Sequence, residues 1–177
     1  MKSKKSLILA IMFLVIVSLI FYKLIGIKNR NLNCIETTKK FLTWYKNNDA
    51  EISSGKYRYI TTNSNGYYEI DFEAEKRYLA YLKTSGYFSD EFLKNLDTYF
   101  VKGNRYFKEQ KLTDDSVPEG FNFDLIFDSQ EVAYIFEKLP NMLKITTVNG
   151  DGKNIMIDNN FNFIFNNQCK IVSNKFI

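Results

Sequence analysis

The sequence predicts an α+β fold, in which an N-terminal transmembrane helix precedes helices packed against an antiparallel sheet. A nearly uncharged apolar run occupies residues 7–27. Three segments within residues 31–111 then carry apolar side chains at helical spacing. After Pro140, short segments with alternating apolar side chains are separated by turn residues. Helices first and antiparallel strands afterwards are typical of the α+β class.

The apolar run extends from Leu7 to Ile27, and Lys23 is its only charge. Its length is close to the roughly 20 residues that span a bilayer. A cleaved signal peptide has a shorter apolar core, about 7–15 residues, and ends at small residues, which "YKLIGIKNRN" does not supply. We therefore expect a retained signal-anchor over residues 1–30 and an exported domain over residues 31–177. Cleavage remains the alternative.

Three helices are expected next. The first covers residues 31–49, with Asn33 as N-cap, Glu36 as its capping-box partner and a buried face of Thr38, Phe41, Leu42 and Tyr45. The second covers residues 71–86, between the cap Asp71 and the stop Gly86. The third covers residues 89–111 and begins at the cap Ser89. Its predicted buried face is Phe92, Leu93, Leu96, Phe100, Gly103 and Phe107.

Strand signals dominate the C-terminal part. Residues 141–148 and 153–158 flank the turn dipeptides Asn149-Gly150 and Asp151-Gly152. Residues 161–165 alternate Phe with other side chains, and residues 169–177 form a last strand. Earlier, residues 56–62 fit a short strand or an extended loop, and residues 121–140 fit either helix or strand.

Charge and composition exclude several function classes. Six of the 24 Lys and Arg precede the first acid, Glu36, so the remainder carries 18 cations against 20 acids, a net charge of −2. A nucleic-acid-binding domain would show a basic excess, and we expect no nucleic-acid partner. The chain has no histidine, which excludes Ser-His-Asp and Cys-His catalysis and histidine-ligated zinc. No catalytic, cofactor or metal motif is recognisable.

Two cysteines, Cys34 and Cys169, stand at opposite ends of the domain. In an oxidising compartment they could form a disulfide, provided that their Cα atoms lie within about 7 Å. The alternative is two separate buried thiols. Cys34 is a poor lipid-attachment site, because Asn33 stands where a lipobox needs a small residue.

Four further residues are candidates for a site. Asp124 and Asp128 belong to the densest acidic region and, four residues apart, could share a helical face. They suggest an acid–base pair or a calcium site, although a solvated loop with an amphipathic element explains them as well, and the alternation of a calcium loop is absent. Trp44 and Tyr45 could line a ligand cleft, or belong to the core and its flank.

Three stretches together resemble the YbjP/YqhG-like family of bacterial envelope domains: "FLTWYKNN", "FNFDLIFDSQEV" and "NNQCKIVSN". The resemblance implies a cystatin- or NTF2-like roll, in which a curved antiparallel sheet wraps a helix. It also implies a location in the cell envelope. With the apolar run, we expect a single-pass protein of the bacterial inner (cytoplasmic) membrane, with residues 7–27 in the lipid bilayer and the domain in the periplasm or another extracytoplasmic space.

The resemblance implies no established activity, so function is predicted by elimination. We expect a non-enzymatic, membrane-anchored domain, without a cofactor, that binds a small ligand or an envelope protein. One alternative is a hydrolase that uses Asp124 and Asp128. Another is an immunity or inhibitor protein that presents an acidic surface to its target. An open groove lined by aromatic side chains would favour the binding domain.

Overall fold

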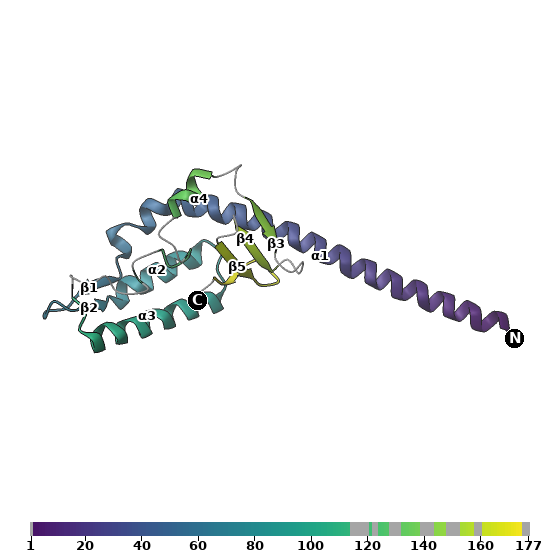
Figure 1. The fold of residues 1–177 in the computed structure, drawn as a ribbon, viewed down its shortest axis with the longest axis horizontal. Helices are drawn as coiled ribbons and strands as arrows, with labels where there is room; N and C mark the ends of the chain where they lie inside the picture. The colour runs from purple at the N-terminus through teal and green to yellow at the C-terminus, as the bar shows by residue number, and fades with distance from the viewer. Residues whose placement is uncertain are drawn as a thin grey trace.

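The long helix α1 (Lys2–Ile52) dominates the computed structural model, which describes residues 2–113, 121, 124–127, 132–138, 144–147, 153–157 and 161–174. Its N-terminal half projects from the domain and its C-terminal half lies within it (Figure 1). The helix contains no proline, and Gly26 is its only glycine, so nothing in the sequence interrupts it. The predicted helix start at Asn33 is therefore wrong: α1 passes through Asn33 and across residues 30 and 31.

The predicted transmembrane helix and the predicted single-pass inner-membrane location are also wrong. In the part of the chain that the structure describes, no helix carries an apolar stretch long enough to cross a membrane.

Two helices lie beside the C-terminal half of α1, and both begin where the sequence predicts. The carboxylate of Asp71 accepts hydrogen bonds from the backbone N–H of Glu73 and Ala74 and caps α2 (Phe72–Thr84). The Ser89 hydroxyl accepts one from the N–H of Phe92, 3.0 Å away, and caps α3 (Asp90–Gln110). The predicted caps are therefore confirmed.

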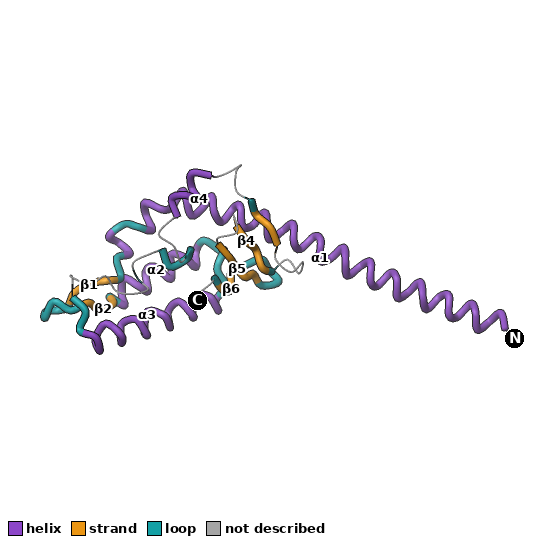
Figure 2. The backbone as a smooth tube through the Cα atoms, viewed as in Figure 1, coloured by secondary structure: helices purple, strands orange, loops and turns teal. Residues whose placement is uncertain are grey.

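The described strands form two separate antiparallel sheets (Figure 2). The strands β1 (Ile60–Thr62) and β2 (Tyr68–Ile70) make a hairpin that packs on α3. The second sheet has the order β3-β4-β5-β6 and contacts α1 and α3. Its strands are Ile145–Thr147, Asn154–Ile157, Phe161–Phe165 and Ile171–Ser173.

The α+β class is confirmed, but the cystatin/NTF2-like roll is wrong. A roll needs one curved sheet that wraps a helix, whereas strands of three to five residues here fall into two small sheets. The hairpin stays apart because β2 is held by α3: the Asn104 side chain accepts a hydrogen bond from the Ile70 N–H at 3.0 Å. The remaining described helices are η1 (Gly55–Tyr57) and α4 (Val132–Lys138).

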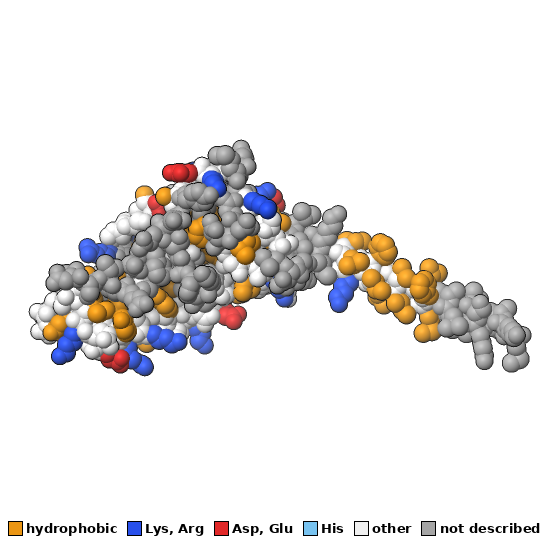
Figure 3. Space-filling model, in the orientation of Figure 1, with side chains coloured by type: hydrophobic (Ala, Val, Ile, Leu, Met, Phe, Trp, Pro, Cys, Tyr) orange, Lys and Arg blue, Asp and Glu red, His pale blue; other side chains and the backbone are white. Residues whose placement is uncertain are grey.

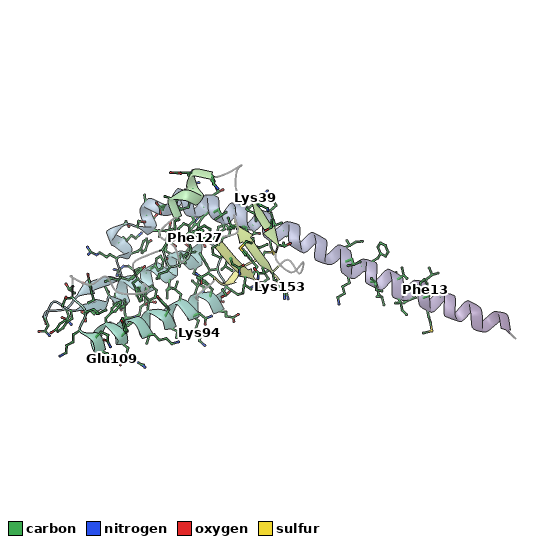
Figure 4. The ribbon with its side chains drawn as sticks, in the orientation of Figure 1. Phe13, Lys39, Lys94, Glu109, Phe127 and Lys153 are labelled. Atoms are coloured by element: carbon green, nitrogen blue, oxygen red, sulfur yellow. A yellow bond between two sulfur atoms is a disulfide. The ribbon has the colours of Figure 1, made fainter. Side chains whose placement is uncertain are left out.

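The core consists largely of aromatic rings between α1, α2, α3 and the larger sheet. Phe41 on α1 is fully buried, and its ring centroid lies 5.6 Å from Phe88, 5.9 Å from Phe127 and 5.6 Å from Phe163. Phe127 lies in the interior of the domain, between segments far apart in the sequence (Figure 4). Edge-to-face and stacked rings therefore join the helical and strand halves.

Gly103 on α3 makes room for one of these rings. A Cβ atom at this position would lie 2.5 Å from Cε2 of Phe121, which is less than any van der Waals contact allows. Phe121 in turn packs against Phe100 and Phe107 on the same helix. The missing side chain at Gly103 is thus what lets the ring of Phe121 lie against α3.

The projecting half of α1 exposes apolar side chains to solvent (Figure 3). Phe13, Leu14 and Phe21 are each more than 60% exposed. Phe13 points away from the helix and contacts no other element (Figure 4). The described part of the chain provides no element that covers this surface.

Candidate functional site

Asp124 lies half-buried in a turn that faces α1. Its Oδ1 atom accepts hydrogen bonds from the backbone N–H of Ile126 and Phe127, both at 2.9 Å. Its Oδ2 atom accepts one from the hydroxyl of Tyr45 at 2.7 Å. Burial raises the pKa of the Asp124 carboxyl above its ordinary value, although these three hydrogen bonds act in the opposite direction.

Tyr45 is fully buried and supplies the donor in this pair. Burial, and then the charge of Asp124, raise the pKa of its hydroxyl well above the ordinary value, so the hydroxyl keeps its proton. The pair ties α1 to the turn 124–127, with Tyr45 inside the core and Asp124 half-buried at its edge. The predicted second carboxylate, Asp128, lies outside the described residues.

Trp44 is half-buried in a cluster of rings. Its ring centroid lies 6.0 Å from Tyr81 on α2 and 5.8 Å from Tyr87. Through these contacts, Trp44 on α1 packs against α2. Trp44 and Asp124 each contact Tyr45, and neither lines the grooves described below.

Cys34 and Cys169 form a disulfide, with their Cα atoms 5.0 Å apart. Cys34 is the first buried residue described on α1, at the point where the helix enters the domain. Cys169 lies in the turn between β5 and β6, where its φ of +55° is one that L residues rarely adopt. Asn166 shapes this turn, because its side chain accepts hydrogen bonds from the N–H groups of Gln168 and Lys170.

A groove of about 540 Å³ is lined by residues at the C-terminal end of α1 and around β1; these elements lie far from the N-terminus (Figure 2). Phe121 and three tyrosines are among its lining residues, and Arg58 is the only charged one among those that the structure describes. The strand or loop predicted for residues 56–62 gave no indication of this groove. The lining residues are Ile52, Ser53, Ser54, Gly55, Tyr57, Arg58, Tyr59, Ile60, Tyr68 and Phe121.

The polar groups around this aromatic groove differ in their charge and in their ion pairing. Arg58 is exposed, and within the described residues no acidic side chain forms an ion pair with it. The neighbouring cation, Lys56, is bound to Glu51 at 3.0 Å. Burial, and then the charge of Asp124, raise the pKa of Tyr59, so its phenol is neutral in the groove wall. The groove is therefore apolar, with one available positive charge at its rim.

The outer edge of β1 borders this groove. The Asp71 N–H donates to the Tyr59 carbonyl, and the Asn63 N–H donates to the Tyr67 carbonyl, so residues 59 and 63 face β2. By alternation, the backbone N–H and C=O groups of Ile60 and Thr62 point away from β2. In the described part of the chain, β1 pairs with β2 alone.

A second groove, of about 550 Å³, lies beside the disulfide. It is lined by polar side chains from α1 and from the β5–β6 turn, without any aromatic ring. Glu36 on its wall is paired with Lys39 at 2.9 Å. The lining residues are Gly26, Asn33, Glu36, Thr37, Lys40, Asn167, Gln168 and Cys169.

Metal ligands do not gather in the described residues: no three of their Cys, Asp and Glu side chains could hold one ion. Comparison of the chain with models of protein families, with curated proteins and with solved structures finds no match.

Proposed function

We propose that this domain is a non-enzymatic binding module that takes up an extended peptide segment of a protein partner in the aromatic groove. The observation that carries the proposal is the position of the open edge of β1 beside the groove. An extended peptide adds to such an edge through main-chain hydrogen bonds, while neighbouring pockets select its side chains.

The composition of the groove indicates which peptide it prefers. Tyr57, Tyr68 and Phe121 offer a surface for an apolar or aromatic side chain. Arg58 at the rim suits a carboxylate, because a guanidinium binds carboxylates through two parallel hydrogen bonds. The expected ligand is thus an extended segment with an apolar side chain close to an acidic one.

The proposal is tested by selecting binders from phage-displayed random peptides with the full chain in its disulfide-bonded form. The selected peptides are expected to share an apolar residue near Asp or Glu. In calorimetry they should bind Arg58→Glu roughly tenfold more weakly, because the charge that pairs with the peptide is reversed. Arg105→Glu, which changes an exposed arginine outside the groove, is the matched control and should leave affinity unchanged.

A second variant distinguishes strand addition from side-chain docking. Thr62→Pro removes one backbone donor from the open edge of β1, where proline is tolerated. It should weaken peptide binding roughly tenfold while the thermal unfolding midpoint changes little. The proposal would be overturned if the selection yielded no binding peptide. It would also be overturned if the selected peptides bound Arg58→Glu and Thr62→Pro as tightly as they bind the natural chain.

A further inference from the structure

A buried carboxyl group outside the groove lies where α2 faces α3. Glu75 on α2 is only 1% exposed, and its Oε1 atom has no hydrogen-bond partner in the described part of the chain. A buried polar atom without a partner costs free energy, and a buried charge without a partner costs more. Position 75 therefore favours a neutral side chain.

The facing helix makes this preference stronger. Asp97 lies on α3, the helix that packs against α2, and its negative charge adds to burial in raising the pKa of Glu75. A like charge disfavours the ionised form of a neighbouring carboxyl. Because Glu75 is the buried carboxyl, its ionisation is the costly one.

Few cations lie where they could compensate the negative charge of an ionised Glu75. Lys76 on α2 is the one cation that lowers the pKa of Glu75, and its ammonium is already bound to Glu73 at 2.8 Å. The segment η1, which also packs against α2, carries Lys56, and that ammonium is bound to Glu51 on α1. The negative charge of an ionised Glu75 would therefore remain largely uncompensated.

We propose that Glu75, with the charge of Asp97 on the facing helix, forms a pH-sensitive carboxyl pair, which holds α2 against α3 while Glu75 is protonated and loosens the two helices when Glu75 ionises. Tyr78, on the same buried face of α2, contacts Tyr57 and Tyr59, so α2 is in contact with the groove wall. The loosening needs no ligand in the groove and goes beyond the peptide binding proposed above.

The direction of the pH effect follows from the two states of Glu75. Burial, and then the charge of Asp97, raise the pKa of Glu75 to about 7 in the packed state, from an ordinary value of 4.5. The packed state thus binds the proton more tightly than the loosened state does. The packing of α2 on α3 is strongest below pH 4.5, the ordinary pKa of a glutamate. It weakens as the pH rises, and the stabilisation from protonated Glu75 is lost above about pH 7.

Hydrogen exchange of the full, disulfide-bonded chain tests the pair. After correction for intrinsic exchange rates, amides of α2 and of the facing part of α3 should lose protection roughly tenfold or more between about pH 5.5 and about pH 8. Glu75→Gln cannot ionise and should make this protection independent of pH. Glu109→Gln, at an exposed position of α3 outside the described ion pairs, is the control that should keep the natural pH dependence.

A direct titration keeps the test decisive if Glu75→Gln fails to fold. In carbon-13 NMR, the carboxyl of Glu75 should titrate near pH 7 in the natural chain, and at lower pH in Asp97→Asn, which removes the repelling charge. A Glu75 midpoint near 4.5, or the same pH-dependent loss of protection in Glu75→Gln as in the natural chain, would overturn the proposal.

Discussion

At the scale of single residues, Asp124 owes its position to a contact with a residue 79 positions away. Its short distance from Tyr45 places a half-buried carboxylate beside an aromatic core, where hydrogen bonds make the charge tolerable. Oδ1 serves the turn 124–127, and Oδ2 serves α1. Asp124 thus fastens two parts of the fold.

Asp124→Ala should lower the free energy of unfolding by about 2–4 kcal/mol, because it leaves the Tyr45 hydroxyl and two N–H groups without their acceptor. Tyr45→Phe should cost less, about 1–2 kcal/mol. Urea unfolding of both variants and of the double variant measures the coupling energy of the pair. Strictly additive costs would show that the contact contributes nothing.

The sequence could single out Asp124 as unusual, since it stands in an acidic region between apolar residues. It could not show that its partner is Tyr45, because a hydrogen bond between residues so far apart depends on how the helices pack. The same reason explains why the sequence analysis did not find Glu75: its facing residue, Asp97, lies on a different helix.

At the scale of elements, local signals were the most reliable guides. Asp71 and Ser89 begin their helices because each cap bonds to N–H groups within three residues, a geometry that the sequence alone determines. Asn33 has a similar cap signature but lies inside α1, because its upstream neighbours are helical too. A cap signal therefore predicts a helix start only where the preceding residues do not form helix.

Strand content was predictable, but sheet assembly was not. Alternating apolar residues and turn dipeptides located the strands of the β3–β6 sheet. The β1–β2 hairpin separates from that sheet through packing on α3, above all through Asn104, and no local pattern encodes this contact. The aromatic groove has the same origin, because Tyr57, Tyr68 and Phe121 meet only after the hairpin packs.

The disulfide between α1 and the β5–β6 turn is expected to be a large contributor to stability. It joins residues separated by 135 positions, so its removal should lower the free energy of unfolding by about 4–5 kcal/mol in the chain-entropy model. Guanidinium unfolding with and without a reductant measures this difference. Cys34→Ser with Cys169→Ser is the matched variant, and the reductant should then have no further effect.

At the scale of the whole molecule, the projecting half of α1 and the domain differ in how much apolar side-chain surface they expose. The domain buries its aromatic residues, whereas the projecting segment exposes Phe13, Leu14 and Phe21. Large exposed apolar patches in water are rare on monomeric proteins and promote association.

The full chain should therefore self-associate in detergent-free buffer as its concentration rises. Replacing Phe13, Leu14 and Phe21 together by Gln should shift the chain toward monomer in analytical ultracentrifugation. Val101→Gln, at an isolated exposed apolar position on α3, serves as the control and should leave association unchanged. Equal association of both variants would show that the segment is not responsible.

The bridge at Cys34 also determines how the molecule carries mechanical load. A pull on the N-terminus travels along the projecting helix and enters the domain at Cys34, the first buried residue described on α1. From there a covalent path leads directly into the β5–β6 turn, so tension need not peel the rest of α1 away from the aromatic core. Such a load would therefore reach the sheet through the disulfide as well as through the contacts of α1.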